Sequence, residues 1–357
     1  MRVDVGGYAV TLADSFAGLD VPGEPGRCVL VSNPVVGPLY RAEVEAELRA
    51  SGWDPVHVEV PDGEVHKTLA TYVALVDAIL DVRPDRRTPV LALGGGVTGD
   101  LVGFAAATAL RGLPVVQLPT TLLAMVDSSV GGKTGVNTRH GKNLVGAFHP
   151  PVAVWAALHA LRTLDDAELR CGLGEVVKHA VIAGPDALAR CEALAPRLLA
   201  RDPEALRAVV ADSVATKARV VAADPFEQGQ RAVLNLGHTL GHAIEAVAGY
   251  GALRHGEAVA IGLAAMARFA TARGWCEDPG LADRIAGLLV ALRLPVRPPG
   301  NLDRHALEAA VGFDKKRARG KVKVAVPRLE GHIELRSLPL DEVPSLVQTL
   351  YTAAEIP

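Results

Sequence analysis

The pattern of apolar residues changes near Pro150 and Pro151, and this change constrains the fold more than any other feature of the sequence. Before these prolines, short apolar runs rich in β-branched residues alternate with stretches that repeat apolar residues at helical spacing. The predicted strands are residues 27–32, 56–60, 89–93, 114–118 and 152–155, and the predicted helices are 40–50, 69–81 and 97–110. This alternation predicts an α/β domain with a mostly parallel, Rossmann-like sheet and helices on both faces.

Beyond Leu164 the strand signals nearly vanish, and long amphipathic windows replace them. The predicted helices are residues 167–182, 203–223, 231–248, 256–273 and 281–292, with one late hairpin at 321–326 and 332–335. Tandem prolines interrupt helices and supply no ladder donors, so they mark a boundary. Since 357 residues also exceed what one core usually organises, we predict an α/β domain over residues 1–155 and a mainly helical domain over 156–357.

Composition and charge exclude several classes of partner. The chain is 49% hydrophobic and 22% charged, which is ordinary for a globular protein. A net charge of −3 and a pI near 6.4 provide no overall field that would attract nucleic acid or anionic lipid. We therefore expect neither nucleic acid nor a membrane as partner, and any positive charge that matters must be local.

The four cysteines and the N-terminus indicate a reducing compartment. Cys28, Cys171, Cys191 and Cys276 are far apart and form no C-x-x-C pair, which argues against thiolate zinc sites and a disulfide framework. The N-terminus lacks a basic segment followed by an apolar one, and no apolar run approaches the roughly 18 residues of a membrane span. We expect reduced thiols and a cytoplasmic location.

A glycine-rich turn, Gly94-Gly95-Gly96, directly follows a predicted strand and opens a predicted helix. Such a turn leaves backbone N–H groups and the positive end of a helix dipole facing an anion, and the missing side chains let a pyrophosphate approach. The alternative is a tight turn with no ligand. Asp100, one turn into the helix, is suited to accept from a ribose, or it is simply a carboxylate favourable to the helix dipole.

A second polar cluster follows the next predicted strand, at residues 119–123, 127–135 and 141–143. In an open α/β sheet, loops at the carboxyl ends of the strands form the ligand crevice, so these polar, glycine-rich loops are expected to converge there. Lys133, Lys142 and Asn143 are candidate contacts to phosphate or carboxylate groups. Solvated loop charges are the alternative interpretation.

Histidines and carboxylates in the second half have the spacing of a divalent metal site. His238 and His242 are four residues apart in a helical window, which places them on one face with Glu245, and His255 begins another apolar helix. Two imidazoles and a carboxylate with an open position are typical of catalytic Zn²⁺, and Co²⁺ or Fe²⁺ can substitute. We predict Glu175, His238 and His255 as ligands; isolated histidines are more often ordinary core or surface residues, and the other histidines have no such context.

The most basic segment of the chain, residues 314–321, lacks interleaved aromatic residues. Since aromatic residues make up only 4% of the chain and its net charge is negative, a nucleic-acid patch is a poor interpretation. We interpret the segment as part of a clamp for a small anionic substrate.

The chain resembles the 3-dehydroquinate synthase family of the sugar phosphate cyclase superfamily over nearly its whole length. The motifs that carry the resemblance are E-x-x-K-T at 64–68, G-G-G-x-x-G-D at 94–100, P-T-T-L-L at 119–123, D-S-S-V-G-G-K-T-G at 127–135, G-K-N at 141–143, G-L-x-E-V-V-K at 172–178, R-x-x-L-N-x-G-H-T-x-G-H-A-I-E at 231–245, H-G-E-A-V at 255–259 and D-K-K at 314–316. Nine motifs in the family's order make a chance match implausible.

This resemblance implies a lyase of the shikimate pathway, which leads to the aromatic amino acids. Its substrate would be an anionic seven-carbon keto acid phosphate, 3-deoxy-D-arabino-heptulosonate 7-phosphate, and its products 3-dehydroquinate and phosphate. The implied route is transient oxidation by NAD⁺, β-elimination of phosphate, re-reduction and aldol closure, with a bound Zn²⁺ or Co²⁺ and no net redox change. The resemblance also implies NAD binding by the first domain, metal and substrate binding by the second, and a homodimer.

Residue roles carried over from the resemblance fall into three groups. Glu175, His238 and His255 would hold the metal, and Glu227 and His242 would relay the proton at the oxidised hydroxyl. The substrate clamp would comprise Asp127, Lys133, Asn143, Lys178, Lys217, Arg231, Asn235, Lys316 and, from the partner subunit, Arg111. The NAD contacts would be Asn33, Glu64, Lys67, Gly95, Gly96, Val97, Asp100, Thr120, Thr121, Leu123, Asp127, Lys133, Lys142 and Thr163. Pro34-Val35 after Asn33 removes a second polar contact to the adenosine ribose that some relatives have.

Three other functions remain open at this point. Sugar phosphate cyclases that accept a substrate without a carboxylate differ at the clamp, whereas Lys217, Arg231, Asn235 and Lys316 here keep the dehydroquinate type, which a desolvated carboxylate needs. Metal-dependent polyol or alcohol dehydrogenases share the glycine turn and the H-x-x-x-H spacing but release reduced cofactor. A catalytically silent nucleotide-binding protein would be expected to lack part of the metal and relay set, and here that set is complete.

Overall fold

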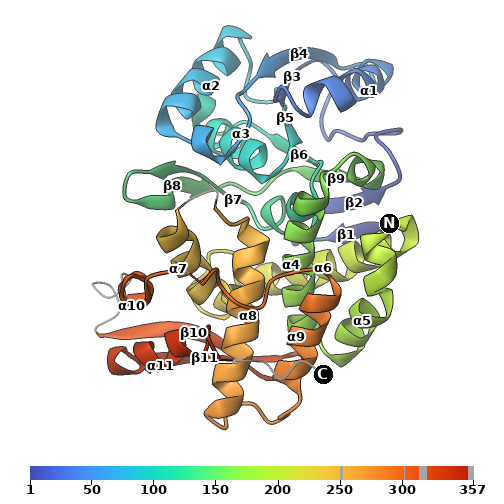
Figure 1. Ribbon diagram of the computed structural model, residues 1–357. Coiled ribbons are helices and arrows are strands. Elements are labelled where there is room, and N and C mark those ends of the chain that lie inside the picture. The colour runs from blue at the N-terminus through green and yellow to red at the C-terminus, as the bar shows by residue number, and fades with distance from the viewer. Residues whose placement is uncertain (250–251, 301, 313–319, 353–357) are drawn as a thin grey trace. The chain divides into compact units, whose positions relative to one another are not determined.

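Seven strands form the sheet of the first unit of the chain, which contains residues 1–165 and 217–222 (Figure 1). The computed structural model describes residues 1–249, 252–300, 302–312 and 320–352. In spatial order the strands are β1 (Arg2–Asp4), β2 (Ala9–Ala13), β9 (Ala153–Ala157), β6 (Val115–Pro119), β5 (Val90–Gly94), β3 (Arg27–Ser32) and β4 (Asp54–Glu59). All neighbouring pairs are parallel except β1 with β2, so the predicted mostly parallel sheet is confirmed. The strands β1 and β2 were not predicted.

Three helices connect the strands of this unit: α1 (Gly37–Ala50), α2 (Leu69–Asp81) and α3 (Gly96–Thr108). Strand β5 and residues 28–31 of β3 are buried and apolar, as expected for strands covered on both faces. Side chains of β3 and β5, such as Val31 and Ala92, form one core cluster with Leu75 of α2 and Leu101 of α3. The core therefore fixes the strand ends from which the polar loops emerge.

The polar segment around Lys133 and Lys142 forms a hairpin and not the loops that we expected. The strands β7 (Lys133–Thr138) and β8 (Gly141–Phe148) pair antiparallel. A Cβ at Gly135 would lie 2.8 Å from the carbonyl oxygen of Val145, so this glycine permits close strand pairing. The prediction was wrong because we interpreted such glycines as loop residues.

The second unit, residues 166–216 and 223–357, is mainly helical. Its helices are α4 (Asp166–Ala183), α5 (Pro185–Leu199), most of α6 (Pro203–Ala223), α7 (His238–Ala248), α8 (His255–Ala272), α9 (Leu281–Ala291), α10 (Arg304–Val311) and α11 (Val343–Gln348). The helix α5 was not predicted. The predicted late hairpin is confirmed as β10 (Lys321–Leu329) with β11 (His332–Pro339).

The predicted helix 231–248 is two elements. Residues Gln230–Asn235 form the 3-10 helix η5, and α7 begins only at His238. Gly237 separates them with a φ of 80°, in the left-handed region that an interior helical residue does not adopt. The break lies directly before the first predicted metal ligand of α7.

Within the described residues, no helix is both long and apolar enough to cross a membrane.

The four cysteines are free thiols, as predicted, and three of them are buried. Burial raises the pKa of Cys28, Cys171 and Cys191 to about 12, so these thiols stay protonated at neutral pH. Only the thiolate reacts readily. We therefore expect a disulfide reagent at pH 8 to label at most one thiol rapidly in the native protein, the partly exposed Cys276, and all four after denaturation. Rapid labelling of two or more native thiols would contradict this packing.

Candidate metal and nucleotide sites

The glycine turn forms the nucleotide candidate site in the first unit. Strand β5 ends at Gly94, and α3 starts at Gly96 with Gly95 as an N-cap that has no side chain. A Cβ at Gly95 would lie 3.0 Å from Thr121 Cγ2, and one at Gly96 2.9 Å from Ser128 Oγ. The first amide groups of α3 are thus left to an outside partner, and only backbone fits in the turn.

The strand order places the carboxyl end of β3 beside this turn. The chain runs from β3 outward to β4 and then returns to β5 on the other flank of β3, so the carboxyl ends of β3 and β5 flank a topological switch point. Asn33 directly follows β3, and its Nδ2 donates to Asp62 Oδ1 at 2.9 Å and to Thr98 Oγ1 at 3.3 Å. Asn33 and the glycine turn therefore lie at the place where α/β sheets bind nucleotides.

Lys67 joins several of the predicted cofactor residues. Its buried ammonium group pairs with Asp100 and donates to Asn143 Oδ1 at 2.6 Å. Burial raises the pKa of Asp100, and the Lys67 charge opposes that rise. Asn137, which the sequence analysis did not single out, donates to Glu64 Oε1 at 2.7 Å and accepts from the Asn143 backbone at 3.0 Å. This network brings Glu64, Lys67, Asp100 and Asn143 together.

Lys217 and Asp127, which were predicted separately as site residues, form an ion pair in this unit. The Lys217 ammonium donates at 2.6 Å both to Asp127 Oδ1 and to the Asp127 carbonyl oxygen. Asp127 belongs to a π-helical turn, Ala124–Ser128, and such turns are frequent at functional sites. The turn is held at its start by Thr121, whose Oγ1 accepts from the Ala124 backbone at 3.1 Å.

The other predicted residues of this unit range from exposed to buried. Lys133 and Arg111 are exposed, and Arg111 has a left-handed backbone with a φ of 66°. Thr163 hydrogen-bonds the hydroxyl of Tyr40. Thr120 is buried, and the following residues are partly buried: Val97, Leu123 and Lys142.

Glycines adjacent to each predicted metal ligand bring the ligand-bearing helices of the second unit together. A Cβ at Gly174 would overlap the carbonyl oxygen of Gly256, and a Cβ at Gly256 would overlap that of Cys171. The helices α4 and α8 therefore touch backbone to backbone beside Glu175 and His255. In the same way, a Cβ at Gly237, beside His238, would lie 2.9 Å from the backbone of α8. Contacts this close need glycine, and they bring the three ligands within reach of one another.

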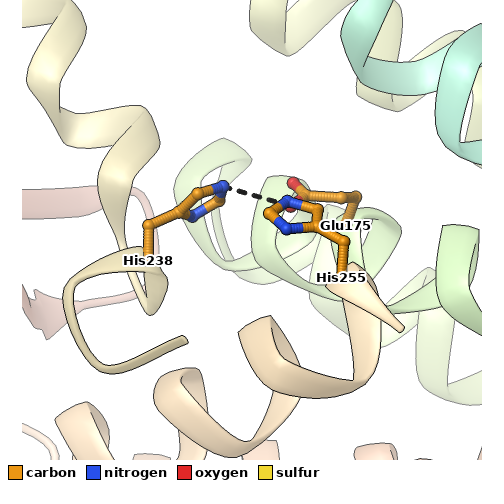
Figure 2. Close-up of side chains that lie close together, drawn as sticks. All are labelled: Glu175, His238 and His255. Atoms are coloured by element: carbon orange, nitrogen blue, oxygen red, sulfur yellow. Dashed lines mark ion pairs between the residues drawn. The ribbon is translucent and has the colours of Figure 1, made fainter. Parts of the chain in front are cut away.

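Glu175, His238 and His255 converge, as Figure 2 shows. Glu175 Oε1 lies 3.4 Å from His238 Nε2 and 3.5 Å from His255 Nε2. Two ligands of one tetrahedral Zn²⁺ with bonds of about 2.0–2.1 Å are separated by roughly 3.4 Å. Neither carboxylate oxygen of the fully buried Glu175 accepts a well-aligned hydrogen bond within the described residues. Oε2 is ion-paired with Lys178, whereas Oε1 faces the two imidazoles, so spacing and donor types both suit a divalent cation.

Charge in this cluster is distributed unevenly. Burial favours a higher pKa for Glu175, but Lys178, whose Nζ lies 2.5 Å from Oε2, and then the imidazoles hold that pKa well below its usual value. Burial and then the Lys178 charge lower the pKa of His238 to about 3. Burial alone would lower the pKa of His255, but the Glu175 and Glu245 carboxylates raise it to about 10. Without a cation, His255 therefore carries the proton.

A second group of potential ligands shares His255. His242, Glu245 and His255 also have ligand atoms within 4.8 Å of one another. Glu245 is buried, and its Oε2 lies 3.2 Å from His255 Nδ1, whereas His242 is exposed. Sequence spacing places Glu245 on the histidine face of α7 but indicates no role for it.

Two of the remaining predicted residues, Arg231 and Asn235, belong to η5, and Glu227 precedes it in the chain. Asn235 Nδ2 donates to Glu227 Oε1 at 3.5 Å, and Glu227 has a left-handed backbone with a φ of 55°. Arg231 is buried, and its guanidinium donates to the Pro225 carbonyl at 2.7 Å. Lys316 lies outside the described residues.

Comparison with known proteins assigns the chain to a family. Residues 57–171 match the family described as 3-dehydroquinate synthase N-terminal, and residues 172–317 match 3-dehydroquinate synthase C-terminal. The chain is 46% identical to a 3-dehydroquinate synthase of Methylococcus capsulatus over 94% of both chains, and 51% identical to that of Geobacter metallireducens over 77% of this chain and 76% of the relative.

Solved structures of related cyclases have the same fold. The 2-epi-5-epi-valiolone synthase ValA of Streptomyces hygroscopicus, solved with NAD⁺ and Zn²⁺, is 29% identical with a TM-score of 0.86 over 98% of both chains. An iron-containing alcohol dehydrogenase shares the fold at a TM-score of 0.71 and 15% identity, over 98% of this chain and 99% of that one. Because the family match spans both units and the sequence identity is high, the chain belongs to the 3-dehydroquinate synthase family.

Proposed function

We propose that the chain is a 3-dehydroquinate synthase that converts 3-deoxy-D-arabino-heptulosonate 7-phosphate into 3-dehydroquinate and inorganic phosphate. The observation that carries this proposal is the 46% identity to a named 3-dehydroquinate synthase over 94% of both chains, in a protein whose Glu175, His238 and His255 converge. A polyol dehydrogenase is not favoured, because the likeness to solved alcohol dehydrogenases extends to the fold alone.

NAD⁺ would bind residues of the first unit, and the metal ion would bind residues of the second. The glycine turn and the Lys67 network would hold NAD⁺, and Glu175, His238 and His255 would hold Zn²⁺ or Co²⁺. The NAD⁺ and Zn²⁺ bound in the ValA structure support this assignment. When bound, NAD⁺ accepts and returns a hydride, and the cation acidifies the substrate hydroxyl that is oxidised.

The chain's own residues would bind the substrate and move its protons. The Lys217, Lys178 and Arg231 cations are buried, which suits them to desolvated carboxylate and phosphate groups. Asn235 contacts Glu227, so a substrate group that binds this asparagine lies near a carboxylate able to exchange a proton. The exposed His242 beside the metal ligands would relay that proton toward solvent.

A coupled assay tests the proposed reaction. The protein with NAD⁺, Co²⁺ and the seven-carbon keto acid phosphate is expected to release phosphate with no steady rise in absorbance at 340 nm. A matched analogue that lacks the carboxylate is expected to react far more slowly, since it would lose its charge-assisted contacts with the clamp cations. Steady accumulation of NADH would instead identify a dehydrogenase, and faster turnover of the analogue would identify another sugar phosphate cyclase.

Metal affinity is expected to depend on pH through His255. A cation needs the neutral imidazole, and the raised pKa of about 10 keeps His255 protonated at neutral pH. Glu175 and His238 have lowered pKa values and hold no competing proton above about pH 5. The apparent association constant should therefore rise roughly tenfold per pH unit between pH 6 and 8. Chelator competition at several pH values measures this slope, and a flat profile would contradict the assigned protonation.

The homodimer and the cytoplasmic location implied by the resemblance belong to the same proposal. Arg111 is exposed on the first unit, which leaves its side chain available to a partner subunit. Sedimentation velocity of the purified protein checks the assembly, and activity of the Arg111→Ala variant tests the predicted contribution across subunits.

A further inference from the structure

His255 lies between two buried carboxylates, one on each side of its ring. Its Nε2 lies 3.5 Å from Glu175 Oε1, and its Nδ1 lies 3.2 Å from Glu245 Oε2. The side chain of Glu175 is fully buried and that of Glu245 is 4% exposed. The three residues come from α4, α7 and the first position of α8, so tertiary packing sets their order.

The two ring nitrogens of an imidazole point away from each other and cannot bind one ion. His238 Nε2 lies on the Nε2 side of His255, 3.4 Å from the shared Glu175 oxygen. A cation held by these three groups therefore uses Nε2 of His255, and Nδ1 remains on the far side, facing Glu245. Because carboxylates accept and do not donate, that contact requires the proton of the neutral ring to sit on Nδ1.

We propose that Glu245 is a positioning residue that holds His255 in the Nδ1–H tautomer and turns its Nε2 lone pair toward the metal site. This inference rests on the proposed function, since it assumes a cation at Glu175, His238 and His255. A carboxylate behind a ligating imidazole fixes the ring and makes it a better donor to the metal. Glu245 lies on the same face of α7 as His238, so one helix supplies both a ligand and the support of the other ligand.

The alternative is that Glu245 binds the ion itself, together with His242 and His255, whose ligand atoms also lie within 4.8 Å. The observed contacts favour the positioning role. Oε1 of Glu175 is buried, accepts no well-aligned hydrogen bond within the described residues, and faces two imidazoles at the separation of two ligands of one ion.

The test measures Co²⁺ affinity by chelator competition together with the visible absorption of bound Co²⁺. Glu245→Ala removes the acceptor and is expected to weaken binding about 10–100-fold and to shift the Co²⁺ bands. Glu245→Gln keeps an acceptor oxygen but loses the charge. Since charge-assisted hydrogen bonds are about twice as strong as neutral ones, it should weaken binding by roughly 3–10-fold. The matched control is Glu257→Gln. Glu257 lies two residues from His255, and its carboxylate accepts a hydrogen bond from the Arg254 backbone at 2.9 Å. The Co²⁺ affinity of this variant should equal that of the wild type.

The outcomes distinguish a positioning role of Glu245 from a role as metal ligand. If both Glu245 variants bind Co²⁺ with wild-type affinity and spectrum, the positioning role is overturned and the metal site stands. If binding survives His238→Ala but is lost in Glu245→Ala, Glu245 is a ligand of a different site, and the positioning role is again overturned. If Glu245→Ala does not fold, the nearly isosteric Gln variant decides by its affinity. A wild-type protein that binds no Co²⁺ overturns the proposed function, and the role of Glu245 with it.

Discussion

Replacing His255 by alanine is expected to abolish metal binding and to lower kcat by about a thousandfold or more. One of three protein ligands is lost, and the cation's stabilisation of developing charge is worth several kcal/mol, or about three powers of ten in rate. NAD⁺ affinity should stay within a factor of about two, because independent sites usually couple by less than about 0.5 kcal/mol. Phosphate release, metal analysis and calorimetric NAD⁺ titration measure the three quantities.

The control for this variant is His305→Ala. The His305 side chain is 93% exposed and belongs to none of the candidate sites, so this substitution should leave turnover and metal content unchanged. Circular dichroism of both variants separates a lost site from a lost fold. If the His255 variant retains wild-type activity or a full complement of metal, the assigned ligand set is wrong.

Gly256→Ala is expected to destabilise the second unit by about 3 kcal/mol or more and to remove activity with it. The new Cβ would overlap the Cys171 carbonyl oxygen in the backbone of α4, where no side chain can move aside. Separation of α4 from α8 would also pull Glu175 away from His255. For a unit of this size the expected fall in Tm is roughly 6–12 °C, which calorimetry or thermal circular dichroism measures.

Gly287→Ala is the matched control for the glycine contact. Gly287 lies inside α9, and a Cβ there would meet nothing within 4 Å. The same change should therefore raise stability by about 0.5–1 kcal/mol, as glycine-to-alanine changes do in open helical positions. If both variants unfold at the same temperature, the close approach of α4 and α8 is not what the structure indicates.

The sequence by itself determined the class of each half of the chain. Residues 27–32 form a strand with the predicted bounds, and 203–223 a helix with the predicted bounds, because a short apolar, β-branched run and a period of 3.6 in apolar residues both report local geometry. Motif spacing also selected Glu175, His238 and His255, which the structure brings together, although their role as metal ligands stays a prediction.

The local sequence pattern gave wrong predictions where a glycine allows two elements to pack closely. The glycines of β7 and β8 suggested loops, yet they allow two strands to pair closely, and Gly237 interrupts a helix that periodicity alone makes continuous. In each case the residue's function depends on a backbone that is distant in sequence, so no window along the chain contains the information.

The tertiary structure alone decided how the chemistry is arranged within each unit. Sequence spacing placed His238, His242 and Glu245 on one face of α7, but it could not show that Glu245 faces Nδ1 of His255 while Glu175 faces Nε2. This arrangement of the two carboxylates around His255 depends on the close packing of α4, α7 and α8 at Gly174, Gly237 and Gly256. Amino-acid types determine which groups can bind a cation, and contacts between segments far apart in the chain determine which of them reach it.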